Sequence, residues 1–214
     1  MLELIWQGLL ETLYMTLVST LLSYVIGLPL GVILVVTDKE GIRPFVPLNA
    51  FLGVIINFTR SAPFLILLIA IIPFTRLIVG TTIGSTATIV PLVIAAAPFI
   101  ARLVESSLKE VDKGVIEAAQ SMGASTFEII YKVLLPEARP SLIIGSAIAV
   151  TTILSYSAMA GIVGGGGLGD IAIRYGYYRY QNDIMIVTVA VLVVVVQLFQ
   201  EIGMKLAKIG DKRL

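Results

Sequence analysis

Apolar residues fill long stretches of the chain, and charged residues gather between them. Residues 12–37, 78–101 and 140–169 contain no Asp, Glu, Lys or Arg. Each stretch exceeds the ~20 residues that an α-helix needs to cross a bilayer. A helix of a soluble protein would carry charges along one face, and these segments have none. The pattern therefore predicts an all-α integral membrane protein.

The apolar segments predict five transmembrane helices. Their expected bounds are about Thr12–Val36, Phe51–Phe74, Ile83–Val104, Ser141–Val163 and Ile184–Ala207. No linker, low-complexity tract or internal repeat interrupts them. We therefore expect one transmembrane domain at residues 9–206, with a long loop at about 105–139, followed by a tail at 207–214.

The distribution of Lys and Arg predicts the direction of the chain through the membrane. Five spans place the two termini on opposite sides. One set of loops carries eleven Lys and Arg residues, the other set carries three, and Arg60 lies within the second span. Loops rich in Lys and Arg stay in the cytoplasm. The loop 105–139 and the C-terminus are thus expected in the cytoplasm, with the N-terminus outside.

The composition agrees with a membrane protein and narrows the chemistry. The chain of 214 residues is 57% hydrophobic and 14% charged, against about 25% charged in soluble domains. It has no Cys and no His, which removes disulfides, thiol chemistry and the commonest metal ligands. Its net charge of +1 implies no attraction to nucleic acid. We find no paired carboxylates, nucleophile constellation or metal cluster in the sequence.

The charged loop 105–139 predicts two short helices. The first is expected over Glu110–Met122 and the second over Ser125–Leu134, with Ser125 as N-cap and Glu128 as its capping-box partner. Gly123 lies between them, where a sharp turn favours a residue that tolerates positive φ. Pro136 is expected to end the second helix and return the chain to the membrane.

One motif in this loop carries the functional prediction. Glu117-Ala118-Ala119 is followed by Gly123 and then by Val133-Leu134-Leu135-Pro136. This spacing resembles the segment by which membrane subunits of bacterial ATP-binding cassette (ABC) importers engage their ATPase, with Val133 where Ile is more usual. The resemblance implies a coupling role for Glu117, Ala118, Ala119, Gly123, Leu135 and Pro136. The alternative is an ordinary amphipathic connector, since Glu-Ala-Ala alone is a common helical triplet.

Three residues in the spans are candidates for the translocation path. An intramembrane Arg such as Arg60 is a functional hypothesis by default. It could instead reach the cytoplasmic surface or pair within the bundle, and we favour these structural roles. By resemblance to the same importers, Tyr156 and Met159 would line the path or its gate, although helix packing explains them equally well.

The glycine run Gly164–Gly167, continued by Leu168 and Gly169, follows the fourth span. It lacks the Lys-Ser/Thr of a phosphate-binding loop. One interpretation is a flexible linker. The other is a tight or re-entrant outer turn that lets backbones approach closely.

Much of the chain resembles permeases of the methionine uptake family. The resemblance is carried by residues 72–76, 79–81, 95–102, 156–159 and 166–169. It implies the transmembrane domain of a type I ABC importer in a bacterial cell membrane, working as a homodimer in lipid. Two cytoplasmic ATPase subunits would bind ATP and Mg, leaving this chain without a cofactor or enzymatic activity. An extracytoplasmic binding protein would deliver L- or D-methionine.

Three alternatives remain open. The chain could be the same type of permease for another amino acid or small solute. An ion-coupled secondary carrier would usually place acidic residues inside the spans, and we find none there. A non-transporting scaffold would not need the full spacing of the loop motif.

Overall fold

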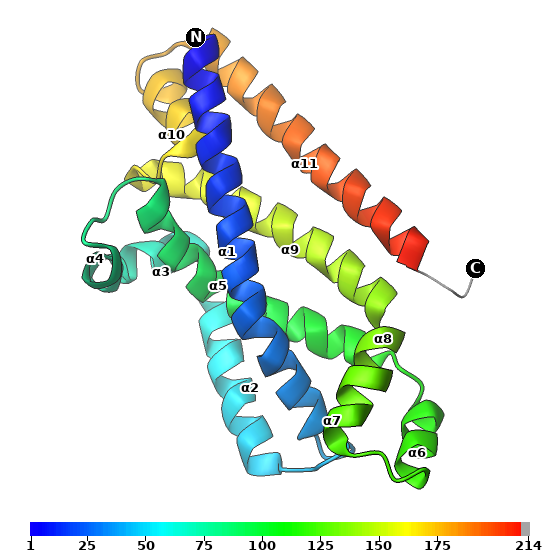
Figure 1. Cartoon of the computed structure of the whole chain (residues 1–214). Coiled ribbons are helices and arrows are strands. Elements are labelled where there is room, and N and C mark those ends of the chain that lie inside the picture. The colour runs from blue at the N-terminus through cyan, green and yellow to red at the C-terminus, as the bar shows by residue number, and fades with distance from the viewer. Residues whose placement is uncertain (211–214) are drawn as a thin grey trace.

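The computed structural model describes residues 1–210, which fold into helices joined by short turns (Figure 1). The last turn of the final helix reaches Gly210, so the expected tail at 207–214 is helical as far as that residue, and 211–214 lie outside the described residues. The elements are α1 Leu2–Val36, α2 Val46–Ser61, α3 Phe64–Ala70, α4 Ile72–Val79, α5 Ser85–Lys109, α6 Lys113–Ser121, α7 Thr126–Ile129, the π-helix η1 Ile130–Leu134, α8 Leu135–Glu137, α9 Arg139–Ala160, the 3-10 helix η2 Gly161–Val163, α10 Gly167–Ile171, the π-helix η3 Ala172–Tyr177 and α11 Asn182–Gly210.

Four segments of the described chain are long and apolar enough to cross a membrane. They are Leu2–Val36, Ser85–Lys109, Arg139–Tyr177 and Asn182–Lys208. A fifth span exists if α2 and α3 are taken together, although the two helices meet at an angle of 99°. The prediction of an all-α membrane protein with five apolar segments is confirmed.

The second span differs most from its prediction. A single helix was expected at 51–74, but α2 ends at Ser61 and α3 begins at Phe64. Pro63 is the physical cause, because the residue before a proline is driven out of the helical region. Ala62 accordingly adopts ψ 126°. The break leaves the end of α2 beside the middle of α5, and α3 packs against both α5 and α9 (Figure 1).

Helix α1 begins ten residues earlier than predicted. Its 35 residues span about 52 Å at 1.5 Å per residue, well beyond the ~30 Å of the hydrocarbon core. The charges of Glu3 and Glu11 had limited the predicted span. Glu11 has a structural role, because its carboxylate accepts a hydrogen bond from the backbone N–H of Gly167 at 2.6 Å.

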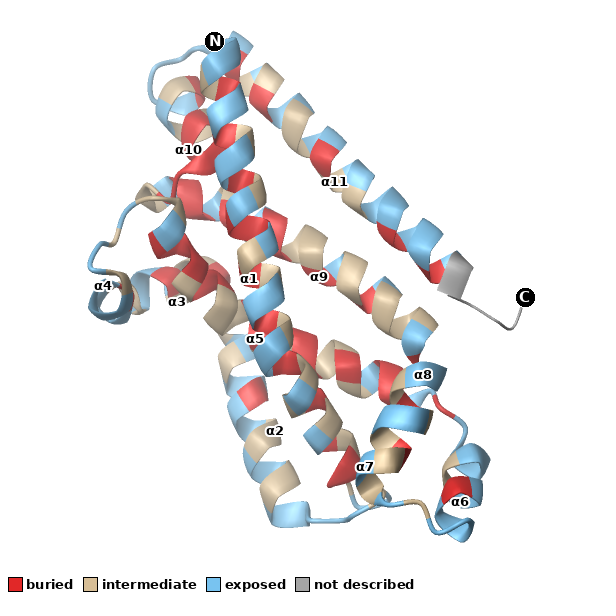
Figure 2. Cartoon of the chain, viewed as in Figure 1, coloured by how far each residue is buried: buried red, intermediate tan, exposed pale blue. Residues whose placement is uncertain are grey.

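Close packing of α1 on α5 forms the centre of the bundle, where Figure 2 shows buried residues on both helices. Small residues of α1 permit the approach. A Cβ atom at Gly27 would lie 2.7 Å from the carbonyl oxygen of Ala97, and one at Gly31 would lie 2.7 Å from that of Ala101. Membrane helices associate through such small-residue contacts, since lipid provides no hydrophobic drive between them.

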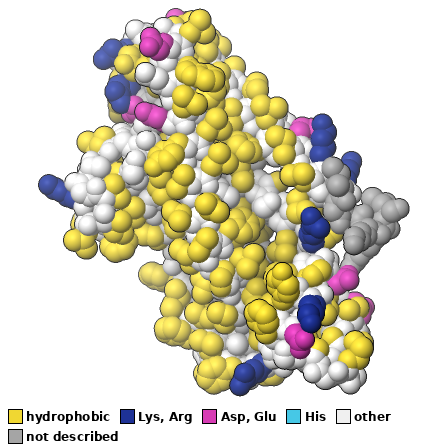
Figure 3. All heavy atoms as spheres, viewed as in Figure 1, with side chains coloured by type: hydrophobic (Ala, Val, Ile, Leu, Met, Phe, Trp, Pro, Cys, Tyr) yellow, Lys and Arg dark blue, Asp and Glu magenta, His cyan; other side chains and the backbone are white. Residues whose placement is uncertain are grey.

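Helix α11 lies at the edge of the bundle against α9 (Figure 1). A Cβ atom at Gly203 would lie 2.2 Å from that of Ala147, so the two helices are close there. The outer face of α11 exposes large apolar side chains, and Figure 3 shows the apolar surface that covers this side of the molecule. Exposed apolar area of this extent suits contact with lipid.

The glycine run forms a tight, buried turn between α9 and α10. Gly164, Gly166 and Gly167 have positive φ, which glycine adopts without strain. A Cβ atom at Gly169 would lie 2.2 Å from the carbonyl oxygen of Ala158. The interpretation as a flexible linker is therefore wrong, and the interpretation as a tight turn is confirmed.

Candidate functional site

The loop 105–139 folds into a compact unit at one end of the bundle (Figure 1). Its first helix is shorter than predicted, since α5 continues to Lys109 and α6 begins only at Lys113. The expected single helix over Glu110–Met122 is thus wrong at its start. Asp112 interrupts it by acting as N-cap of α6, where its carboxylate accepts the N–H of Gly114 at 2.7 Å.

Gly123 ends α6 in a Schellman motif. Its φ of +79° lies in the left-handed region. The N–H of Gly123 donates to the carbonyl of Gln120 at 2.9 Å, and the N–H of Ala124 donates to that of Ala119 at 3.1 Å. A Cβ atom at position 123 would meet nothing within 4 Å. The requirement for glycine is therefore one of backbone conformation, as the sequence indicated.

The second helix of the loop begins as predicted. Ser125 Oγ accepts the N–H of Glu128 at 3.3 Å, and Glu128 Oε2 accepts the N–H of Ser125 at 3.0 Å, so the capping box is confirmed. The backbone hydrogen bond from Ser125, aided by Lys132, lowers the pKa of Glu128 to about 2. Glu128 is thus a stable carboxylate that fixes the turn after Gly123.

Pro136 does not end the second helix, contrary to the prediction. The π-helix η1 precedes it, and the N–H of Leu135 reaches back five residues to the carbonyl of Ile130. Pro136 lies in the first turn of α8, where its missing N–H costs little. The chain stays helical to Glu137 and continues as α9 from Arg139. Leu135 is half-buried and Pro136 is exposed.

The three residues of the Glu-Ala-Ala triplet have different environments. Glu117 and Ala118 are exposed, whereas Ala119 is 5% exposed and belongs to the main apolar core. The resemblance had implied that both alanines contact a partner. The structure assigns Ala119 to internal packing, where it anchors α6 to the body of the protein.

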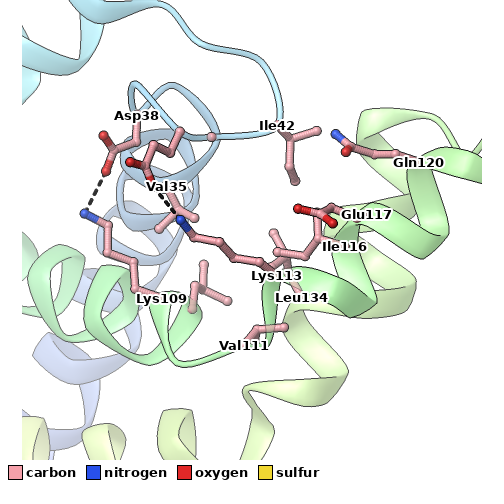
Figure 4. Close-up of a pocket in the computed structure, with 13 residues that line it drawn as sticks. Val35, Asp38, Ile42, Lys109, Val111, Lys113, Ile116, Glu117, Gln120 and Leu134 are labelled. Atoms are coloured by element: carbon pink, nitrogen blue, oxygen red, sulfur yellow. Dashed lines mark hydrogen bonds and ion pairs between the residues drawn. The ribbon is translucent and has the colours of Figure 1, made fainter.

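Ion pairs connect α6 and the end of α5 to the turn between α1 and α2 (Figure 4). Lys113 pairs with Glu40, and Lys109 contacts Asp38 at 2.8 Å and Glu105 at 2.9 Å. The hydrogen bond from Lys109 lowers the pKa of Asp38, and that from Lys113 lowers the pKa of Glu40. Sequence reasoning missed this turn, although its charged run beside Gly41 marked it as a surface element.

A cavity of about 410 Å³ lies between this turn and α6 (Figure 4). Its apolar lining includes Val35, Ile42 and Leu134. Charged residues also line it, among them Glu117 of the triplet and the Lys113–Glu40 pair. The exposed face of α6 therefore stands beside a recess with both apolar and charged lining, which can receive a side chain of a partner.

The candidate path residues separate into two groups. Arg60 and Tyr156 line one cavity of about 220 Å³, although they come from α2 and α9. Met159 is 47% exposed and does not line that cavity. Within residues 1–208, no group of three or more Asp or Glu side chains could hold a metal ion.

Known proteins similar to this chain are membrane transport subunits. Residues 23–206 match the family model of the binding-protein-dependent transport system inner membrane component. A probable D-methionine transport system permease protein of Vibrio cholerae is 57% identical over 95% of this chain and 90% of its own. The methionine import system permease protein of Bacillus subtilis is 45% identical over 98% of this chain and 94% of its own.

The solved structures that resemble this chain are also chains of ABC transporters. A chain of the MetNI methionine ABC transporter, in an inward-facing conformation, matches with a TM-score of 0.98 and 47% identity, covering 99% of this chain and 98% of that one. A chain of an amino acid ABC transporter solved with histidines matches with a TM-score of 0.77 at 23% identity, which shows the shared fold.

The apolar helix bundle and its compact charged loop, together with these matches, define a membrane permease subunit of the ABC importer class. The chain belongs to the family of binding-protein-dependent transport system inner membrane components.

Proposed function

We propose that the chain is the permease subunit of an importer that moves methionine, in its L- and D-forms, across the cytoplasmic membrane. The supporting observation is the similarity, over nearly the whole chain, to permeases and a transporter named for methionine. ATP hydrolysis on a separate partner drives the transport. ATP and Mg bind to that partner, and this chain contributes no cofactor.

The loop 105–139 and the C-terminus lie in the cytoplasm, and the N-terminus lies outside. The excess of Lys and Arg in the loops of one side supports this orientation. The chain has no Cys, so single cysteines at Ser106 and at Thr82 can report the two sides by labelling with a membrane-impermeant thiol reagent. Labelling of Thr82→Cys only after the membrane has been opened would contradict the orientation.

The exposed face of α6 couples the chain to its ATPase. Glu117 and Ala118 present a small, charged surface that fits a helix-in-groove contact. Ala119 and Gly123 hold α6 in place from behind, through the core and the Schellman motif. Leu135 and Pro136 form the joint with α9, so that movement of α6 is passed to a span.

The assembly contains two copies of this chain, two copies of the ATPase and one extracytoplasmic methionine-binding protein. A single chain carries one coupling helix, and an ABC ATPase pair needs two. Rotation of the coupling helices as the ATPases close would open the path alternately to each side of the membrane. The transmembrane domain covers 9–206.

Uptake of radiolabelled methionine tests the function. The chain is reconstituted with its ATPase and binding protein in vesicles that contain ATP. We expect uptake that needs ATP and the binding protein, and that excess unlabelled L- or D-methionine suppresses. Competition by another amino acid alone would reassign the solute. Uptake that survives without ATP but collapses with an uncoupler would support an ion-coupled carrier instead.

A further inference from the structure

A cavity of about 220 Å³ lies at the break between α2 and α3, with α5 and α9 beside it. It is lined by Thr59, Arg60, Ala62, Phe64, Ala95, Phe99 and Tyr156. A cavity needs only ~10–15 Å³ of such volume for one water molecule, so this one has room for a small solute. None of the residues that line it is acidic.

Arg60 brings a positive charge to this cavity from the last turn of α2, where its side chain is exposed in the single chain. It lies fourteen residues after Val46, or about 21 Å along α2. That depth is too great for the side chain to reach the surface at the start of α2. In the part of the chain that the structure describes, the Arg60 guanidinium has no ion pair or hydrogen bond. An unpaired Arg at this depth is costly.

Aromatic rings form much of the remaining lining. The rings of Phe64 and Tyr156 stack with centroids 4.4 Å apart and planes at 4°. Phe99 of α5 adds a third ring to the lining. The stack fixes the Tyr156 ring, and its hydroxyl group has no hydrogen-bond partner in the described residues. The cavity thus combines a free cation, a free hydroxyl and apolar surface.

We propose that this cavity binds the solute during transport, with Arg60 holding the α-carboxylate of an amino acid. The planar guanidinium pairs with a carboxylate through two parallel hydrogen bonds. The Tyr156 hydroxyl donates a third hydrogen bond to the same carboxylate. The three aromatic rings receive the apolar side chain, and a thioether sulfur interacts favourably with such rings.

This inference rests on the proposed function, because it names the group of the solute that the permease recognises. It also explains the break after Ser61. A continuous helix would have filled the space with backbone, whereas the break ends α2 one residue after Arg60 and lets Phe64 of α3 stack on Tyr156. The cavity needs no contribution from the ATPase or from the binding protein.

Thiol protection in the purified complex of the permease with its ATPase tests the site directly. The chain has no Cys, so Ala95→Cys places a single thiol of this chain in the cavity, and Ser106→Cys serves as an exposed control. Methionine should slow alkylation of Ala95→Cys and leave Ser106→Cys unchanged. Methioninol, which has a hydroxymethyl group in place of the carboxylate, should not protect.

The contribution of the charge is measured in the same background. Arg60→Gln should raise the half-protecting concentration of methionine about tenfold or more, since a charge-assisted hydrogen bond is worth more than the ~1.4 kcal/mol of a tenfold change. Arg76→Gln, which removes an exposed Arg on α4, should leave it unchanged. Tyr156→Phe keeps the ring stack and should raise the concentration by a smaller factor. Arg60→Lys should restore part of the protection if Arg60→Gln assembles poorly.

Equal protection by methionine and methioninol, or no protection at all in a complex that transports methionine, would overturn the inference and leave the proposed function standing. If the wild-type complex fails to transport methionine, the proposed solute is wrong. Protection of Ala95→Cys by another amino acid, lost with Arg60→Gln, would then still support the carboxylate site.

Discussion

Substitution of Gly123 isolates the backbone requirement of the coupling helix. The residue has φ +79° and open space around its missing Cβ, so Gly123→Ala introduces conformational strain without a steric clash. The left-handed conformation costs an alanine about 1–2 kcal/mol. If the Schellman motif must be intact for docking, the fraction of competent molecules falls about 5- to 30-fold. Gly123→Asn should lose less, because Asn tolerates this region better.

The assay is the affinity of the purified permease, in lipid nanodiscs, for its isolated ATPase. Gly80→Ala provides a matched control, since Gly80 ends α4 with φ +81° and a Cβ atom there would also meet nothing within 4 Å. It imposes the same strain on α4, which lies away from α6 (Figure 1). We expect about a 5- to 30-fold weaker affinity for Gly123→Ala and no change for Gly80→Ala. Equal affinities for both variants and the wild type would refute the reasoning.

Three further changes have defined outcomes. Glu128 has a pKa of about 2, below its ordinary 4.5. The stabilisation from the capping box is therefore complete above about pH 4.5 and is lost as the pH falls through about 2. The protection of the Glu128 amide from hydrogen exchange should fall over the same pH range. Gly27→Ala should lower the Tm of the purified permease by an amount equivalent to about 1–3 kcal/mol, because its Cβ would lie 2.7 Å from the carbonyl of Ala97. Lys113→Glu should weaken ATPase binding by repulsion from Glu40, and the reversed pair Glu40→Lys with Lys113→Glu should restore it.

Each of these has a control. Val25→Leu changes the exposed, opposite side of α1 and should leave the Tm unchanged; an equal loss would mean that α1 responds to any substitution. A protection factor at the Glu128 amide, taken relative to exchange of an unstructured chain at the same pH, that stays unchanged down to about pH 2 would show that the carboxylate does not fix the turn. ATPase affinity that stays low in the reversed pair would show that Lys113 contacts the ATPase itself.

Local signals in the sequence predicted local structure well. Charge-free segments marked the spans because a charge is costly in lipid wherever it lies along a helix. The spacing of Ser125 and Glu128 predicted the capping box, and Gly123 predicted the sharp turn, since each depends on residues within one helical turn. Pro63 carried the signal for the break in the second span, but the apolar run around it outweighed that signal.

Features that depend on distant contacts could not be predicted. The sequence does not show that Ala119 faces the core, because the triplet allows either face to point inward. Nor does it show that Arg60 and Tyr156 line one cavity, since the packing of both α2 and α9 against α5 brings them there from ninety-six positions apart. Glu11 appeared as the edge of a span, whereas it lies within α1 and its carboxylate accepts a hydrogen bond from Gly167, 156 positions away.

The buried glycine turn after α9 bears on how related sequences are compared. A methyl group at Gly161, Gly165, Gly167 or Gly169 would approach neighbouring atoms to within 2.2–2.7 Å, so every lineage that keeps this backbone is held to glycine here. Identity at these positions then records inheritance of the fold and carries no information about the cargo. Relatives that diverged to carry other solutes should share the turn unchanged. Residues that distinguish them are to be sought where side chains vary without strain, as around the break in the second span.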